Sequence, residues 1–275
     1  MSRIPLEDNF TDVIAKSQRG LKISDADLAA RAEVSLDDLA AVKGGRVIDA
    51  VIRRLARHLH LGPHALEDLA HQRWYPAIPD LRHGFAMFNT AYEDMRVNSY
   101  LVWDPRSKAS AAFDTGADSG GLIDLVRAEG LRLDYVFLTH THEDHVADLA
   151  KLAAAAGAGV WASEREPADF PGSKTFKENA YFHLGPLAIK TLSTWGHSPG
   201  MTTYYITGLS LPLAVVGDAI FAASMGGSPT HFADQYRNNC EKILSLPRDT
   251  VLACGHGPLT TLGQELEHNP FFSKA

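Results

Sequence analysis

The stretch that decides the fold is Tyr135–Asp148, with the sequence YVFLTHTHEDHVAD. Its apolar start predicts a short buried strand, and four candidate metal ligands follow within six residues: His140, His142, Asp144 and His145. A two-residue step along extended chain directs the imidazoles of His140 and His142 to the same side. A helix that begins directly afterwards would turn Asp144 and His145 toward a neighbouring point. Imidazole nitrogens combined with a carboxylate suit zinc, iron or manganese.

Three further polar residues stand where apolar strands are predicted to end. His197 lies in a Gly-flanked turn, Asp218 ends the apolar run from Val215, and His256 follows the run from Val251. A carboxyl group at the end of a buried strand needs a partner, because a desolvated charge is costly. Together with the first four, these residues predict one metal centre. Its candidate ligands are His140, His142, Asp144, His145, His197, Asp218 and His256.

The composition is that of a globular protein. The chain has 275 residues, of which 45% are hydrophobic and 21% charged, and this much apolar surface can offset the entropy of ordering. A net charge of −7 gives no whole-chain cationic surface for nucleic acid or anionic membranes. No apolar run reaches the ~18 residues of a membrane span. The N-terminus lacks the apolar core of a signal peptide, so we expect a cytoplasmic protein that does not contact membranes, with Cys240 and Cys254 reduced.

The pattern of apolar residues changes at about position 85. Residues 1–70 carry them at helical spacing, which predicts a small all-α bundle of about five short helices. Residues 71–84, with Pro76 and Pro79, are interpreted as a linker. Residues 85–275 alternate helical stretches with short β-rich runs, nine of them between residues 99 and 253. This interleaving predicts a layered α/β domain.

On these residues the sequence resembles the metallo-β-lactamase superfamily and, within it, the glyoxalase II-like hydrolases. The motif THxHxDH is complete in Thr139–His145, and the remaining candidate ligands follow in the family's order. Asn98–Leu101, Gly255–Pro258 and Asn269–Phe271 extend the resemblance over about residues 85–272. The resemblance implies an α/β fold, an αββα metallo-β-lactamase sandwich, preceded here by the helical bundle.

The resemblance also implies a role for each ligand. The first divalent metal would be held by His140, His142 and His197, the second by Asp144, His145 and His256, with Asp218 as the bridge. Zinc is expected at both positions, with iron and manganese as alternatives. Two such ions generate a hydroxide near neutral pH and polarise a carbonyl oxygen, so no protein nucleophile is required. Asp144 would in addition act as a catalytic residue that orients the hydroxide and accepts its proton.

The activity implied is metal-dependent hydrolysis of a small-molecule thioester or related ester, as in hydroxyacylglutathione hydrolases. The same kind of site also serves lactones, β-lactams and phosphodiesters and, with one iron, persulfide oxidation. An alternative from another class is a transcription regulator whose hydrolase-like domain senses a ligand. Seven intact ligands favour the enzyme, since a sensor need not keep them all.

Two positions bear on the substrate. Tyr204 lies seven residues after His197, where glyoxalase II-like enzymes place a tyrosine that contacts glutathione; an ordinary strand aromatic is the alternative. Such enzymes usually carry a basic residue in the loop after the bridging aspartate, but Gly227 stands there. We therefore predict weak binding of glutathione thioesters unless another cation, such as Lys174 or Lys177, takes that place.

Residues 11–70 resemble the Cro/repressor-type helix-turn-helix family. Ser24–Ala32 would be its second helix and Ser35–Val42 its recognition helix. A recognition helix reads bases with Arg, Lys, Gln or Asn near its start, whereas this one offers Asp37 and Asp38. Residues 1–70 carry 10 Lys and Arg against 11 Asp and Glu. We therefore do not expect DNA binding; a vestigial module, or one that forms a homodimer, is predicted instead.

Overall fold

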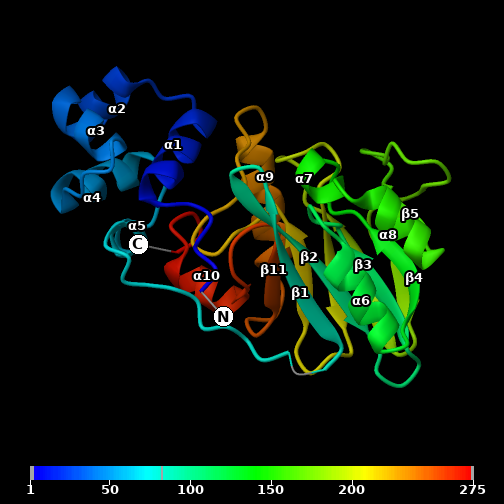
Figure 1. The fold of residues 1–275 in the computed structure, drawn as a ribbon. Coiled ribbons are helices and arrows are strands. Elements are labelled where there is room, and N and C mark those ends of the chain that lie inside the picture. Colours follow the sequence, from blue (N-terminus) through cyan, green and yellow to red (C-terminus); the bar gives the residue numbers. More distant parts are fainter. Residues whose placement is uncertain (1–2, 82, 274–275) are drawn as a thin grey trace.

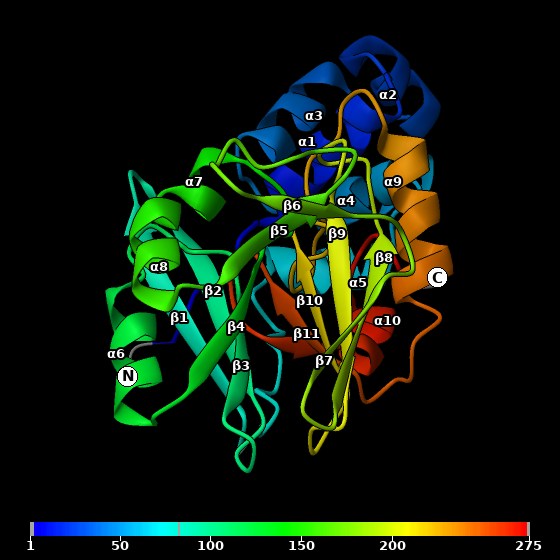
Figure 2. The same ribbon diagram turned by 90° about the vertical axis from the view of Figure 1, so that its right-hand side faces the viewer.

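The computed structural model describes residues 3–81 and 83–273. Two six-stranded sheets face each other, and helices cover the outer side of each sheet (Figures 1 and 2). This arrangement is the predicted αββα sandwich, and helices between residues 10 and 70 precede it as expected. No helix among the described residues has the length and apolar character needed to cross a membrane.

The first sheet has the strand order β1-β2-β3-β4-β5-β6. The pairs β1–β2 and β2–β3 are antiparallel, whereas β3, β4, β5 and β6 run parallel to one another. The parallel strands end at the same edge, which brings the loops that follow them together. The strands are β1 (Phe85–Tyr92), β2 (Met95–Trp103), β3 (Ala109–Phe113), β4 (Arg132–Phe137), β5 (Gly159–Ser163) and β6 (Lys174–Phe176).

The second sheet has the order β12-β11-β10-β9-β8-β7. Only β10 and β11 pair in parallel there. The strands are β7 (Tyr181–Leu184), β8 (Leu187–Ser193), β9 (Thr202–Thr207), β10 (Leu213–Gly217), β11 (Val251–Cys254) and β12 (Thr260–Thr261). Each of the nine predicted β-rich runs falls on a strand, and the structure adds β1, β6 and β12.

The space between the sheets is filled by apolar side chains from both. Phe113 and Phe137 of the first sheet contact Tyr204 of the second, with ring centroids 5.2 and 5.0 Å from the Tyr204 ring. On the outer side of the first sheet, α6 (Gly120–Ala128) and α8 (Leu149–Ala156) cover a separate apolar layer, and the short α7 (Glu143–Val146) precedes α8. The sandwich therefore has a rigid interior on which its edge loops rest.

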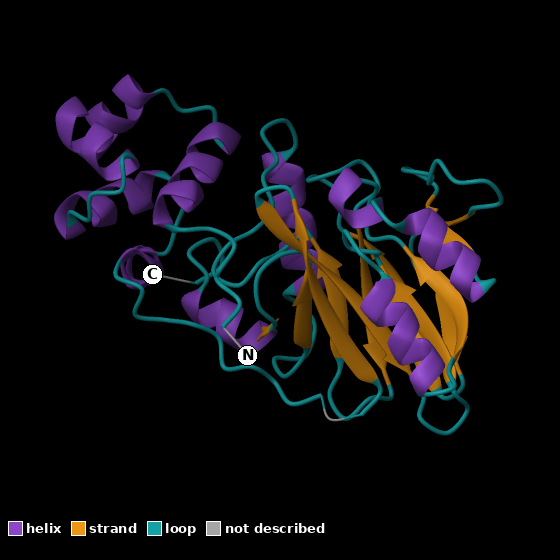
Figure 3. Cartoon of the chain, viewed as in Figure 1, coloured by secondary structure: helices purple, strands orange, loops and turns teal. Residues whose placement is uncertain are grey.

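Five helices form the N-terminal region, at the far side of the second sheet (Figure 3). Side-chain caps start three of them. Asn9 forms a capping box with Asp12, and Ser24 and Ser35 each accept a hydrogen bond from the backbone amide three residues later, that of Asp27 and Asp38. The helices are α1 (Phe10–Gly20), α2 (Asp25–Ala32), α3 (Leu36–Lys43), α4 (Asp49–His58) and α5 (Pro63–Ala70).

The helical region shares one hydrophobic core with the outer face of the second sheet. Apolar residues of α1 to α5 join residues of β10, β11 and the C-terminal segment in a single cluster. The packing is close, because a methyl group on Gly20 would overlap the Phe232 ring. The remaining helices of this layer are α9 (Phe232–Asn238), a π-helical turn η1 (Asn239–Ile243) and α10 (Leu262–His268). Residues 71–81 and 83–84 contain no helix or strand.

Candidate metal centre

All seven predicted ligands come from loops and helix starts at one edge of the sandwich. The loop after β4 carries His140 and His142, and α7 follows with Asp144 and His145. The loop after β8 carries His197, and the ends of β10 and β11 lead into the last two ligands. Short apolar strands therefore deliver the polar residues to the edge, as the sequence predicted.

Two groups of ligand atoms that share no residue form at this edge, and a third group, His140, His145 and Asp218, overlaps both. In the first, His142 Nδ1 lies 3.0 Å from His140 Nε2 and 3.1 Å from His197 Nε2. In the second, Asp144 Oδ2 lies 3.4 Å from His145 Nε2 and 3.3 Å from His256 Nε2. The atoms of each group lie within 4.8 Å of one another, a spacing that could hold a metal ion.

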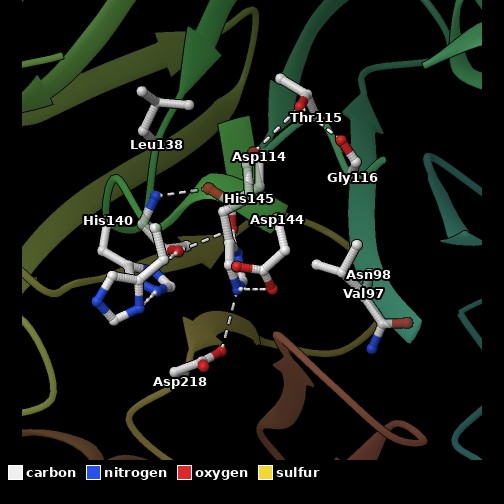
Figure 4. Close-up of polar contacts among 12 residues, drawn as sticks. Val97, Asn98, Asp114, Thr115, Gly116, Leu138, His140, Asp144, His145 and Asp218 are labelled. Atoms are coloured by element: carbon white, nitrogen blue, oxygen red, sulfur yellow. Dashed lines mark hydrogen bonds and ion pairs between the residues drawn. The ribbon is translucent and has the colours of Figure 1, made fainter. Parts of the chain in front are cut away.

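Asp218 lies between the two groups. Its Oδ2 is 3.4 Å from His197 Nε2 and 3.5 Å from His256 Nε2, and its Oδ1 is 3.3 Å from His145 Nε2. Figure 4 shows His145 between Asp144 and Asp218. One carboxylate thus faces imidazoles of both groups, which is the arrangement that a bridging ligand requires.

The buried polar atoms of this centre fit a cation. His145 Nε2 and Asp218 Oδ1 are both buried and form no hydrogen bond within the described chain, although they lie 3.3 Å apart. A buried polar atom without a partner costs free energy, so such atoms rarely persist without a ligand. Their nitrogen and carboxylate oxygen are donors that divalent transition metals accept.

The second ring nitrogen of each of three ligands is held in place by another residue. His145 Nδ1 lies 2.8 Å from Asp114 Oδ2, and the Nδ1 atoms of His197 and His256 lie 2.9 and 2.7 Å from the carbonyl oxygens of Gly227 and Arg96. Such contacts fix the ring orientation and leave Nε2 directed into the centre. This is the outer support that a metal-binding histidine requires.

Sequence reasoning missed Asp114. Its carboxylate accepts hydrogen bonds from Thr139 N and Thr139 Oγ1, both at 2.7 Å, as well as contacting His145. The side chain is buried, and the backbone has a φ of 56°. Asp114 directly follows the apolar strand β3, so its signal is the same as that of Asp218. It therefore joins the β3 and β4 ends beneath the metal centre.

Glu166 is a second missed residue, and it connects two ligand-bearing loops. Its Oε1 accepts hydrogen bonds from Thr141 N and Thr141 Oγ1, both at 2.8 Å, and its Oε2 accepts one from Gly200 N at 2.7 Å. Thr141 separates His140 from His142, and Gly200 follows the turn of His197. A methyl group on Gly200 would lie 2.3 Å from Glu166 Cβ, so only glycine permits this close approach. The carboxylate thus sets the spacing of the first ligand group.

The charges in the centre depend strongly on one another. Burial lowers the pKa of His145, but Asp218 and Asp114 outweigh it and raise that pKa to about 10. Burial likewise opposes the charge on His256, yet Asp218 and Asp144 raise its pKa to about 11. Burial would raise the pKa of Asp218, but the two imidazoles hold it well below its ordinary range. The carboxylates therefore stabilise positive charge at this position. A divalent cation bound by deprotonated ligands would supply that charge.

The position of Tyr204 does not support the predicted substrate contact. The side chain is fully buried between the sheets, and its hydroxyl donates a hydrogen bond to Leu138 O at 2.6 Å. Burial and this bond keep the hydroxyl away from any molecule at the metal centre. The alternative interpretation, an ordinary strand aromatic, describes the residue.

Comparison with known proteins agrees with this architecture. The family described as the metallo-beta-lactamase superfamily matches residues 92–256. A hydroxyacylglutathione hydrolase of Brucella ovis is 33% identical over 161 residues, covering 57% of this chain and 60% of the relative. The chain thus spans less than two thirds of the curated relative that it matches.

Two crystal structures at 26% identity resemble the chain. The BLEG-1 B3 metallo-beta-lactamase has a TM-score of 0.59, with 69% of this chain and 100% of that chain covered. TTHA1623 in a di-iron-bound form has a TM-score of 0.54, with 67% and 99% covered. With the family match over more than half of its residues, the chain belongs to the metallo-β-lactamase superfamily.

Proposed function

We propose that this protein is a dinuclear metal-dependent hydrolase of a small-molecule thioester or related ester. The observation that carries the proposal is the place of Asp218, whose two oxygens face His145, His197 and His256 at 3.3 to 3.5 Å. A carboxylate that serves two neighbouring groups of ligands is what a pair of cations needs. The di-iron form of TTHA1623 and the hydroxyacylglutathione hydrolase of Brucella ovis support the metal count and the substrate class.

The ligands would divide as the two groups divide. His140, His142 and His197 would hold one ion, Asp144, His145 and His256 the other, with Asp218 between them. Zinc is the proposed metal, and iron and manganese suit the same nitrogen and oxygen donors. When bound, such ions polarise a carbonyl oxygen and make water acidic enough to react near neutral pH.

The chain's own residues would orient the reacting groups. Asp144 Oδ2 faces the imidazoles of His145 and His256, which leaves Oδ1 to accept the proton of the attacking water. Asp114 and Glu166 would keep the ligand loops at their spacing while the ester is cleaved. Asp144 is thus proposed as the catalytic carboxylate, and Asp114 and Glu166 as positioning residues.

Metal analysis and a substrate panel test the proposal. We expect two metals per chain and cleavage of thioesters in preference to lactones and phosphodiesters, with activity lost on chelation and restored by zinc, iron or manganese. His197→Ala should lose metal and activity, whereas His183→Ala, on the exposed side of β7, should change neither. One iron per chain with oxygen consumption on a persulfide would instead indicate the dioxygenase alternative.

A further inference from the structure

The segment that precedes α1 runs directly along the loops of the metal centre. A methyl group on Gly257, next to the ligand His256, would lie 3.2 Å from Glu7 N. The neighbouring Asp8 is buried, and its carboxylate accepts a hydrogen bond from Ser224 Oγ at 2.5 Å. Ser224 belongs to the loop that follows Asp218. The segment before α1 therefore contacts the two loops that follow β10 and β11.

Lys16 of α1 extends into the same contact. Its ammonium group pairs with Asp8 and donates a hydrogen bond to Met225 O at 3.0 Å, and 15% of its side chain is exposed. Lys16 Nζ lies 5.1 Å from the centroid of the Phe221 ring, which in turn lies 5.6 Å from the His256 ring. One aromatic ring thus separates the ammonium from a candidate ligand.

Gly226 and Gly227, in the loop that Lys16 contacts, carry no side chains. A methyl group on Gly226 would collide with Asp218 O at 2.0 Å, so the chain requires glycine there. A methyl group on Gly227 would meet no atom nearer than Lys16 Cε, at 4.0 Å. The carbonyl of Gly227 accepts the hydrogen bond of His197 Nδ1. The Lys16 side chain therefore lies within contact distance of the point where a side chain at position 227 would begin, beside a carbonyl that supports the first ligand group.

We propose that Lys16 binds an anionic group of the substrate, a carboxylate, at the edge of the metal centre, so that the helical region selects the substrate. The inference rests on the proposed hydrolase function. An ammonium group has three hydrogen-bond donors, and Asp8 and Met225 O use two of them. The third remains for a ligand, and the buried contacts hold the group in position before the ligand arrives, which lowers the entropic cost of binding.

The charges around the centre give the proposal a direction. Glu7 is exposed and lies at Gly257, on the His256 side, whereas Lys16 lies at Gly227, on the His197 side. An anionic group is repelled by the carboxylate of Glu7 and attracted by the ammonium of Lys16. The substrate's carboxylate should therefore lie beside Lys16 and Gly227 rather than beside Glu7 and Gly257.

This placement changes which cation replaces the missing basic residue at position 227. Sequence reasoning named Lys174 and Lys177 as candidates. Lys174 Nζ instead lies 5.3 Å from the Trp161 ring, on neighbouring strands of the first sheet. Lys16 is 211 positions away from Gly227 along the chain, so no local pattern could connect the two.

Two matched thioesters test the proposal: one of 3-mercaptopropionate, which carries a carboxylate, and one of 2-mercaptoethanol, which is neutral. In Lys16→Met we expect KM for the carboxylate thioester to rise roughly 10- to 100-fold, as for loss of a charged hydrogen bond, while KM for the neutral thioester and both kcat values change less than about threefold. Lys16→Arg should restore most of the difference. Lys22→Met, an exposed change two residues after the end of α1, should leave both KM values unaltered.

Lys16→Met leaves Asp8 buried without its cation, so Lys16→Met/Asp8→Asn is measured beside it. An equal change in KM for both thioesters, in the single and the double variant, would mean that Lys16 only fixes α1 to the loop. Calorimetric binding of the two corresponding thioethers, which cannot be hydrolysed, keeps the tests separate. If the wild type cleaves neither thioester, the proposed function fails, while a preference for the anionic thioether that Lys16→Met removes still supports the proposal.

Discussion

The metal centre and the helical region each hold a cluster of side chains of the kinds that bind metals. The two clusters differ in whether the surrounding chain supplies their hydrogen-bond partners. In the helical region, Asp49, Glu67 and His71 lie close enough to hold an ion. There the chain satisfies its own charges: Arg53 donates to both carboxylate oxygens of Glu67, at 2.5 and 2.8 Å, and Asp49 lies 2.7 Å from His71 Nε2.

In the metal centre the chain leaves polar atoms without hydrogen bonds. His145 Nε2 and Asp218 Oδ1 are buried and lack such partners within the described residues. Both clusters combine imidazoles with carboxylates, so these side chains and their proximity do not by themselves identify a ligand site. What distinguishes the metal centre is polar groups that the surrounding chain does not satisfy.

The largest expected effect comes from removing the carboxylate between the two ligand groups. Asp218→Ala should lose most of both metals, and kcat/KM should fall roughly 1,000-fold or more, since even outer partners of metal ligands commonly cost 10- to 100-fold. Elemental analysis and steady-state kinetics measure both quantities. Asp49→Ala, the matched change in the helical region, should leave them unchanged. Two metals and full activity in Asp218→Ala would contradict the dinuclear assignment.

A core substitution in the helical region should lower the stability of the fold but leave the metal content unchanged. Leu55 is fully buried in α4, and Leu55→Ala should lower the free energy of unfolding by about 2–5 kcal/mol through lost burial and a cavity. Metal content per folded chain should not change, because Leu55 is neither a candidate ligand nor a hydrogen-bond partner of one and contributes only to the apolar layer behind β10 and β11. Urea unfolding and elemental analysis of the same samples test this. Metal loss in proportion to the stability loss would show that the two regions are not separable.

Glu265 of α10 offers a buried carboxyl group outside both clusters. Burial raises its pKa from 4.5 to about 7, although Thr260, Asn269 and the Ala223 amide donate hydrogen bonds to it. Because the folded state binds the proton more tightly, the resulting stability is complete below pH 4.5 and is lost as pH rises through about 7.

Relative to Glu265→Gln, the wild type should therefore lose roughly 3 kcal/mol of unfolding free energy between pH 4.5 and 8. Urea unfolding of both proteins in chelator, at a series of pH values, gives this difference directly. Parallel stability curves would mean that Glu265 has the same pKa folded and unfolded. The comparison matters because Asp218, equally hidden, is instead held charged by its imidazoles.

Loosening the link between two ligand loops should have a smaller effect than removing a ligand. In Glu166→Gln the amide nitrogen replaces one acceptor, so either the Thr141 or the Gly200 contact is lost. We expect the affinity for one metal equivalent to fall roughly 10- to 100-fold, measured by titration against a chelator of known affinity. Glu164→Gln, an exposed neighbour, is the control. Unchanged affinity would limit Glu166 to a role in folding.

The smallest effect is expected for DNA. Leu36, Asp37 and Asp38 are exposed at the start of α3, so this helix presents carboxylates to a nucleic acid phosphate backbone. The full chain should give no specific complex with duplex DNA at ~150 mM salt, and Asp38→Asn should not create one. A complex with a defined operator that is weakened by changes in α3 would overturn this prediction.

The candidate ligands could be predicted from the sequence because each stands where an apolar run ends. The starts of two helices could also be predicted from the sequence, since Ser24 and Ser35 accept the hydrogen bonds that N-cap residues accept. Tyr204 could not be assigned, because β9 is buried on both faces along most of its length and alternation does not reveal which side meets the site. Contacts such as Lys16 with Gly227 depend on how distant elements pack, and no spacing rule reports that.

The packing of the N-terminal helices against residues 270–272 has a consequence for biosynthesis. Phe271 and Phe272 lie in the same apolar cluster as α1 to α5, and Gly62 N donates a hydrogen bond to Pro270 O at 2.7 Å. Chains are made from the N-terminus, so these helices emerge before the residues that cover them exist. Their apolar face stays uncovered until the last strands and the C-terminal phenylalanines leave the ribosome. Removal of Pro270, Phe271 and Phe272 is therefore expected to expose apolar side chains of the helical region and to promote aggregation.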